Sequence, residues 1–203
     1  MLKQYRKWSQ NDNSHYSYKL DLRQRYADKT SNKLCFDLFS GTGTYAEAVW
    51  SKKYEQVICI DKSKKQLEQL PSLENIKAYC GDNNKLLIGL INKYGFPDII
   101  DADAYGSPDN IVKRVIMLND CSKKFAIIGT DGSFNARKLG SENTVPTSWD
   151  FGEHLTIAPF SVTMSGAACR TYTFLREWTH NRVTEFEAYA TKSMLYWGCI
   201  VNG

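Results

Sequence analysis

No apolar run in the 203-residue sequence approaches the roughly 20 residues that a membrane-spanning helix needs. The first residues of the chain are not followed by a hydrophobic segment, so we expect no signal peptide. Low-complexity tracts and internal repeats are absent as well. With an apolar fraction of 42%, these absences predict one compact domain rather than a membrane or secreted protein.

Cysteine and histidine are too scattered to indicate a metal site. The histidines His15, His154 and His180 lie far apart, and no Cys-x-x-Cys pair occurs. Most cysteines lie in apolar runs, which predicts buried free thiols and a reducing cytoplasm. The cysteines are Cys35, Cys59, Cys80, Cys121, Cys169 and Cys199.

Short apolar runs alternate with helix-like segments along most of the chain. The strand-like runs are 34–39, 56–60, 75–80, 98–102 and 124–129. The helix-like segments between them are 45–53, 63–70, 84–94 and 109–121. This alternation predicts an α/β fold with a parallel sheet and helices on both faces. Right-handed crossovers then bring all the strand ends to one edge of the sheet.

The C-terminal part has a different pattern. Residues 165–180 are typical of a helix, and residues 182–191 and 194–201 are typical of strands joined by a tight turn at Lys192-Ser193. We therefore expect an antiparallel closing hairpin after the parallel strands.

The segment Asp101-Ala-Asp-Ala-Tyr-Gly-Ser-Pro108 follows the short apolar run Pro97-Asp98-Ile99-Ile100 and places two carboxylates and an aromatic ring at the carboxyl end of the fourth strand-like run. In open α/β sheets, ligands bind at the carboxyl ends of the strands. A helix N-cap would account for Ser107 and Pro108, but not for Asp101, Asp103 and Tyr105. The sequence therefore favours a functional role for these last three residues.

A glycine turn, Ser40-Gly41-Thr42-Gly43-Thr44, follows the first apolar run. Glycines let the backbone approach a ligand closely. Ala46 stands where a dinucleotide fingerprint would need its third glycine, and the P-loop lysine is missing. Asp61 ends the second run about 20 residues later, where an acid can bind the ribose hydroxyls of a nucleoside cofactor. A cap on the following helix is the alternative for Asp61.

A third acid, Asp82, follows the run 75–80 and is itself followed by Asn83. An N-cap for the helix 84–94 explains Asp82 about as well as a ligand contact does, and the two roles are compatible.

The motif Asp37-x-Phe-x-Gly41-x-Gly43 after a strand resembles the first motif of class I S-adenosylmethionine (SAM) methyltransferases. The closing hairpin fits the same family, so the resemblance covers residues 34–201. It implies a Rossmann-like doubly wound sheet, mostly parallel, with SAM as the cofactor. In that family the acid after the third strand binds the adenine amino group. The cofactor-binding residues that it implies are Asp37, Ser40, Gly41, Gly43, Asp61, Asp82 and Asn83.

The segment 101–108 narrows the resemblance to the catalytic domain of tRNA guanine-N2 dimethyltransferases, whose pattern is Asp-x-Asp-Pro-Phe-Gly-Ser-Pro. Tyr105 replaces the phenylalanine and Ala104 replaces the first proline. The segments 82–87 and Thr130-Asp131 also resemble loops of that family. The positions identical to the pattern are Asp101, Asp103, Gly106, Ser107 and Pro108.

The resemblance implies methylation of an exocyclic base amine, most specifically guanine N2 in a tRNA-like RNA. We expect Asp103 to accept hydrogen bonds from the amine and Tyr105 to stack on the base. Asp101, the other catalytic candidate, is a second choice for holding the base or the SAM amino-acid tail. A DNA amino-methyltransferase, a small-molecule methyltransferase and a SAM-binding module without catalysis are the alternatives. The expected substrate-binding residues are Gly106, Ser107, Pro108 and Asp131.

Residues 1–33 are basic and rich in aromatic residues, and we expect them to form an extension of a methyltransferase domain at 34–203. They hold eight Lys or Arg against three Asp, a net charge of +5. The whole chain has a net charge of +4, so the remaining residues together carry −1. Cations and stacking rings suit single-stranded or looped RNA, with DNA as an alternative partner. A helix whose aromatic residues pack on the sheet is the other interpretation. The polar segment 132–158 is long enough to act as a substrate lid.

Overall fold

The computed structural model describes residues 15–104, 106–119, 122–131, 155–157, 162–190 and 194–203. The strands are β1 (Leu34–Asp37), β2 (Gln56–Asp61), β3 (Ile76–Cys80), β4 (Ile99–Asp103), β5 (Phe125–Asp131), β6 (Leu155–Ile157), β7 (Val183–Ala190) and β8 (Leu195–Val201). The helices are α1 (Tyr16–Ala27), the π-helix η1 (Ala46–Trp50), α2 (Ser51–Lys53), α3 (Lys64–Leu67), α4 (Asn83–Tyr94), α5 (Asp109–Leu118) and α7 (Val162–Trp178).

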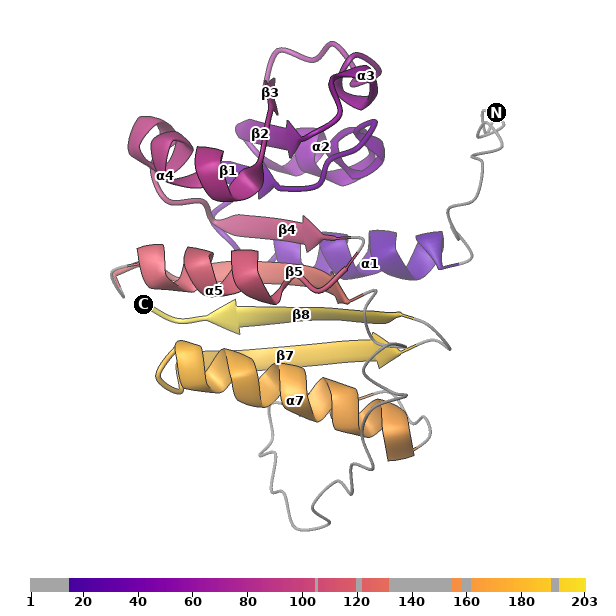
Figure 1. Ribbon diagram of the computed structural model, residues 1–203, viewed down its shortest axis with the longest axis vertical. Coiled ribbons are helices and arrows are strands. Elements are labelled where there is room, and N and C mark those ends of the chain that lie inside the picture. The colour runs from indigo at the N-terminus through magenta and orange to yellow at the C-terminus, as the bar shows by residue number, and fades with distance from the viewer. Residues whose placement is uncertain (1–14, 105, 120–121, 132–154, 158–161, 191–193) are drawn as a thin grey trace.

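These strands form an eight-stranded sheet in the order β3-β2-β1-β4-β5-β8-β7-β6 (Figure 1). Strands β1 to β5 pair in parallel, whereas β8 is antiparallel to both β5 and β7. The predicted fold class, a Rossmann-like sheet with an antiparallel C-terminal pair, is confirmed. Strand β6 was not predicted. It pairs in parallel with β7 and is the one part of 132–158 within the described residues, so the lid hypothesis otherwise falls outside them.

Side chains alternate between the two faces of the central strands, so each strand contributes to two apolar clusters. Ile100 and Ile127 lie in a cluster with buried residues of α4, α5 and α7. Their neighbours Ile99 and Ile128 lie in the other cluster, with α1 and η1. A layer of helices therefore covers each face of the sheet.

Local sequence features fix the start, the packing and the end of helix α4, which begins at the carboxyl edge of the sheet. Leu87 and Leu90 are buried against the sheet at helical spacing. Asp82 caps its start, and the helix ends at Gly95, whose φ of +90° is a left-handed conformation that favours glycine.

Helix α1 packs on the sheet and is part of the core. Leu22, Tyr26 and Ala27 are buried against the face that carries Ile99 and Ile128. The Tyr26 hydroxyl donates a hydrogen bond of 2.7 Å to the carbonyl of Gly198 in β8. Residues 16–27 of the basic N-terminal segment therefore form a helix that packs on the sheet, as the second interpretation of this segment expected. Residues 1–14 lie outside the described part of the chain.

Three global expectations can be compared with the described residues. Cys35, Cys59 and Cys199 are buried free thiols, but Cys80 is exposed because β3 is an edge strand. Among the described residues, no group of three or more His, Cys, Asp or Glu side chains could hold a metal ion. The helices described here are all too short or too polar to cross a membrane.

The contact between α1 and β8 predicts the effect of a small substitution. A Cβ at Gly198 would lie 2.5 Å from the ring of Tyr26, which is buried and hydrogen-bonded. We expect Gly198→Ala to lower the free energy of unfolding by about 1–3 kcal/mol through overpacking, measured by urea denaturation. Gly89→Ala is the matched control. Its Cβ meets open space on the exposed side of α4, so it should stabilise by about 0.5–1 kcal/mol. Equal effects of the two substitutions would contradict this account.

Candidate functional site

The glycine turn after β1 has the geometry that the sequence predicted. Gly41 and Gly43 have φ angles of +55° and +81°. A Cβ at Gly43 would lie 2.2 Å from Leu70 Cδ2, so the chain itself requires glycine there. At Gly41 a Cβ would meet only Gln66 Oε1, at 3.7 Å. Any room for a ligand at this turn is therefore on the Gly41 side.

Asp61 joins the glycine turn to the end of β2. The Gly41 N–H donates to Asp61 Oδ2 at 3.0 Å, and the Ser63 N–H donates to Oδ1 at 2.8 Å. Each carboxylate oxygen has a second lone pair, so Asp61 can still accept hydrogen bonds from a ligand. The residue is partly exposed, which leaves it accessible.

Asp82 and Asn83 begin α4 beside this turn. Asp82 accepts the Asn84 N–H at 2.8 Å, so the N-cap role is observed, and its carboxylate pairs with Lys62 Nζ at 2.7 Å. Asn83 is buried and donates through Nδ2 to the carbonyl of Leu38. Its Oδ1 is buried and has no partner among the described residues, which is a rare state for a polar atom.

Strand β4 extends one residue beyond the predicted run, to Asp103, so Asp101 and Asp103 both lie within it. Residues two apart on a strand share a face, so Asp101 and Asp103 point to the same side. Asp37 is the register partner of Asp101 in the neighbouring strand β1. Three carboxylates therefore gather on the face that α1 covers.

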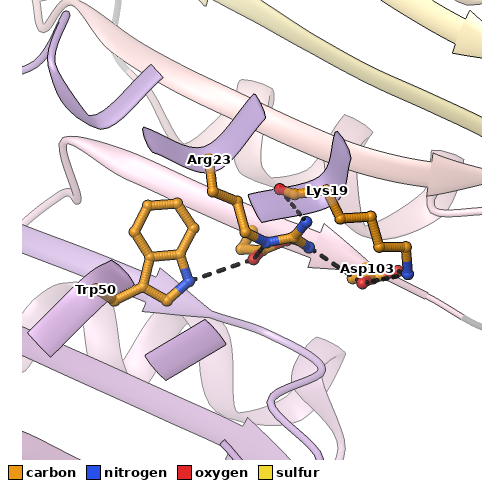
Figure 2. A network of polar contacts seen from close by, with 5 residues as sticks. Lys19, Arg23, Trp50 and Asp103 are labelled. Atoms are coloured by element: carbon orange, nitrogen blue, oxygen red, sulfur yellow. Dashed lines mark hydrogen bonds and ion pairs between the residues drawn. The ribbon is translucent and has the colours of Figure 1, made fainter. Parts of the chain in front are cut away.

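Arg23 of α1 binds Asp101 through two hydrogen bonds inside the protein. Nε and Nη2 donate to the two carboxylate oxygens at 2.6 and 2.9 Å, and both side chains are 1% exposed. The Trp50 indole N–H points at the same carboxylate, at 3.3 Å (Figure 2). Asp101 is fully enclosed by these partners. In this structure Asp101 therefore holds α1 on the sheet, and its expected contact with a substrate stays a prediction.

Asp103 is also paired, but it lies nearer the surface. Lys19 Nζ donates to its two oxygens at 2.9 and 3.2 Å, and Arg23 Nη2 donates at 3.1 Å (Figure 2). Its side chain is 17% exposed, against 1% for Asp101. Within this cluster, Asp103 is the carboxylate that can reach a bound molecule.

The environment shifts the pKa values of the three acids in different directions. Burial raises the pKa of Asp37 well above its ordinary value, which favours the protonated form of this carboxyl. Burial also raises the pKa of Asp101, although Arg23 opposes this. For Asp103, burial is outweighed by Arg23 and Lys19, which together hold its pKa below the ordinary value. Asp103 is therefore anionic and a weak base.

The other residues predicted to bind or stack on the substrate do not all lie beside Asp103. Tyr105 lies outside the described residues, and Gly106 and Ser107 are exposed. Ser107 Oγ accepts a hydrogen bond of 3.2 Å from the Asp109 N–H, and Pro108 is buried at the start of α5. These two residues therefore also help to begin the helix. Asp131 is buried, but alternation along β5 puts it on the opposite face from Asp103 and Thr130. The structure does not bring Asp131 together with the other expected substrate residues.

Lys19, Arg23 and Trp50 were not predicted as site residues. A usable signal was present for the cations, because Lys19 and Arg23 are four residues apart and share one face of a helix. Asp101 and Asp103, two apart on a strand, form the matching pair of acids. Trp50 had no such signal, since it lies in a π-helical segment that replaces the predicted α-helix.

Comparisons with known proteins identify sequence relatives of this chain. A Bacteroides thetaiotaomicron protein described as an uncharacterized RNA methyltransferase is 33% identical over 137 residues, covering 63% of this chain and 30% of the relative. A Porphyromonas gingivalis protein with the same description is 28% identical over 148 residues, covering 62% and 32%. The chain thus spans about a third of the length of these curated relatives. No protein-family model matches it.

Solved structures share the architecture at low sequence identity. Trm1 from Pyrococcus horikoshii, solved with S-adenosyl-L-methionine, is 14% identical with a TM-score of 0.61, covering 95% of this chain and 56% of Trm1. A putative hemolysin from Streptococcus thermophilus is 10% identical with a TM-score of 0.62, covering 99% and 70%. At such identities the likeness concerns the fold alone. The chain therefore has a Rossmann-like fold of the kind found in the Trm1 methyltransferase structure.

The buried acid Asp37 predicts a distinctive pH dependence of stability. Its raised pKa means that the unfolded chain loses this proton at lower pH than the folded chain does. Stability from Asp37 is thus complete below about pH 4 and falls as pH rises toward the folded pKa. We expect Asp37→Asn, measured by urea denaturation from pH 4 to 8, to gain stability over the wild type by up to about 1.4 kcal/mol per pH unit within that window.

Asp98→Asn is the control of opposite sign. Burial opposes ionisation of Asp98, but hydrogen bonds led by that of Lys123 lower its pKa. The loss of stability in Asp98→Asn should therefore be largest at neutral pH and shrink as the solution is acidified. A pH-independent difference for Asp37→Asn would mean that the carboxyl is not held neutral in the folded protein.

Proposed function

We propose that this chain is a SAM-dependent methyltransferase that acts on the exocyclic amine of a base in RNA, most specifically guanine N2. One observation carries the proposal. The positive-φ glycine turn, Asp61 and the partly exposed Asp103 follow or end the strands β1, β2 and β4 at one edge of the sheet. This is where open α/β sheets bind ligands. The relatives described as RNA methyltransferases support RNA as the substrate.

The residues at β1, β2 and β3 fit a SAM-binding half. The open side of Gly41 leaves space for a ligand, and Asp61 beside it has lone pairs for ribose hydroxyls. Asp82 is accessible as an acceptor, and Asn83 Oδ1 is a buried acceptor that has no partner within the described part of the chain. Asp37 and Ser40 are buried, so we assign them to shaping the turn rather than to direct contact. When bound, SAM supplies a methyl group made electrophilic by its sulfonium.

Asp103 is the residue that we propose for the substrate amine. The lone pair of an exocyclic amine is delocalised into the ring, so the amine is a poor nucleophile. A carboxylate that accepts its N–H can turn the lone pair toward the methyl group. Because Arg23 and Lys19 lower the pKa of Asp103, it acts as a hydrogen-bond acceptor rather than as a strong base. The amine proton then leaves to water after the nitrogen–carbon bond has formed.

The direct test is methyl transfer from isotopically labelled SAM to total RNA, followed by digestion to nucleosides. Labelled N2-methylguanosine would support the full proposal. Label on another amino group of RNA would retain RNA methylation and replace the target. Transfer only to DNA, or only to small molecules in an extract, would reject RNA as the substrate.

Asp61 should control affinity for the cofactor. Asp61→Ala removes the acceptors for the ribose and the hydrogen bond that holds Gly41. We expect SAM binding to weaken by about 1.5–3 kcal/mol, roughly 10- to 100-fold in Kd by calorimetry. Glu47→Ala removes an exposed acid beside the same turn and should leave Kd unchanged. Similar affinity in both variants would place the ribose elsewhere.

Asp103 should control turnover rather than cofactor binding. Asp103→Asn keeps the shape and one acceptor oxygen but removes the charge, so we expect kcat to fall about 10²-fold with unchanged Kd for SAM. Glu187→Gln is the control, because Glu187 also pairs with a cation of α1, Arg25, at the exposed side of the helix. It should keep normal kcat. Near-normal turnover in folded Asp103→Asn would remove Asp103 from the proposed mechanism.

A further inference from the structure

Aromatic side chains from three distant parts of the chain meet at the carboxyl edge beside Asp103. They come from the start of α1, from the glycine turn, and from the adjacent ends of β7 and β8, which lie side by side at that edge (Figure 1). The residues of this aromatic cluster are His15, Tyr16, Tyr18, Tyr45, Tyr189 and Tyr196.

The rings form two groups. Tyr16 stacks on Tyr45, with ring centroids 5.8 Å apart and an interplanar angle of 16°. In the other group, the ring centroids of Tyr18 and Tyr189 are 4.3 Å apart. Tyr189 stacks on Tyr196, with ring centroids 6.3 Å apart and an interplanar angle of 14°. Flat rings in near-parallel pairs offer the surface on which a further planar ring can stack.

Lys19 connects both groups to Asp103. Its Nζ lies 5.1 Å from the centroid of Tyr196 and 6.0 Å from that of Tyr45. The same atom is 2.9 Å from Asp103 Oδ2. The aromatic cluster therefore adjoins the carboxylate that we assign to the substrate amine.

Exposure separates five of these rings from the core tyrosines on the same face of the sheet, whereas Tyr196 is itself buried, at 1% exposed, and supports the ring of Tyr189. Tyr26 and Tyr54 are 1% and 3% exposed, and their hydroxyls bond Gly198 and Thr30. By contrast, Tyr16, Tyr18 and Tyr45 are half-buried, as are His15 and Tyr189. Packing alone accounts for the first set. The five rings that remain partly exposed at the ligand edge can contact a bound molecule.

The cations of α1 are already neutralised by acids of the protein. Lys19 pairs with Asp103, Arg23 with Asp101, and Arg25 with Asp21 and Glu187. They are therefore poor partners for phosphates. We therefore assign the contribution of α1 to RNA binding to its aromatic rings rather than to its charge.

We propose that the aromatic cluster binds unpaired nucleobases that flank the target nucleotide in a single-stranded or looped RNA. The inference rests on the proposed function and specifies how that substrate is held. Bases stack on tyrosine with little dependence on sequence, whereas phosphate contacts depend on charge. Stacking on either side of Lys19 would hold the strand so that one base reaches Asp103.

A second set of tyrosines supplies the matched control. Tyr79 and Tyr94 lie at the opposite side of the parallel sheet, on edge strand β3 and on α4. Their hydroxyls are 2.5 Å apart, and Lys93 lies 5.1 Å from the Tyr94 ring centroid. This pair is also aromatic, basic and partly exposed, but it is remote from Asp103.

The experiment measures the affinity of full-length Tyr16→Leu, Tyr189→Leu and Tyr94→Leu for fluorescein-labelled oligoadenylate and oligouridylate of about ten nucleotides. Leucine keeps apolar bulk but removes the stacking face. We expect Kd to rise about tenfold for each of the first two variants and to stay unchanged for Tyr94→Leu. The wild-type preference for the purine oligomer should also shrink, because purines stack more strongly. The salt dependence of binding should stay the same.

Circular dichroism melting and SAM calorimetry on the same samples identify any variant that misfolds. Wild-type affinity in folded Tyr16→Leu and Tyr189→Leu, or a loss confined to Tyr94→Leu, would overturn the inference while leaving RNA methylation intact. A wild-type protein that binds SAM and methylates only DNA or small molecules would instead overturn the proposed function. Loss of oligomer binding with normal SAM affinity in the two cluster variants supports the inference.

Discussion

The buried ion pair between Arg23 and Asp101 fixes the position of α1 on the sheet. Both side chains are 1% exposed, so neither charge has water to solvate it. Removing one partner of such a pair typically destabilises a protein by about 3–5 kcal/mol, because the other charge stays buried alone. The two-hydrogen-bond geometry fixes the rotation of the helix as well as its distance from β4. The hydrogen bond from the Tyr26 hydroxyl to the Gly198 carbonyl holds the same helix against β8.

The ion pair also determines which of the three acids can contact a substrate. Three acids on one face meet two cations, and burial raises the pKa of Asp37, which has neither cation as a salt-bridge partner. Asp101 is then fully enclosed, while Asp103, two residues along the strand, shares Arg23 and Lys19 and keeps part of its surface exposed. The same cations that hold the helix therefore hold Asp103 as an anion. Stability and the proposed substrate contact depend on one set of charges.

The sequence predicts the fold well because the fold depends on local patterns. Apolar runs alternating with helical segments predicted the parallel strands and the closing antiparallel pair, and glycine spacing predicted the turn at Gly41. The network at Asp101 could not be predicted locally. Arg23 is 78 residues away in the sequence, and acids within a strand look like strand-end acids until a partner is known. The face of Asp131 could not be read from the apolar run either, because the run ends before this residue whereas β5 includes it.

These contacts bear on where the functional unit begins. We expected residues 1–33 to be an extension of a domain at 34–203, but α1 supplies Leu22 and Tyr26 to one apolar cluster and both cations to the carboxylate cluster. A domain that began at residue 34 would leave Asp101 buried without its cation. We therefore propose that the folded unit begins no later than Tyr16, and that the start of α1 belongs to the site. The helix that completes the core then also brings its first aromatic residues to the edge where the substrate is expected to bind.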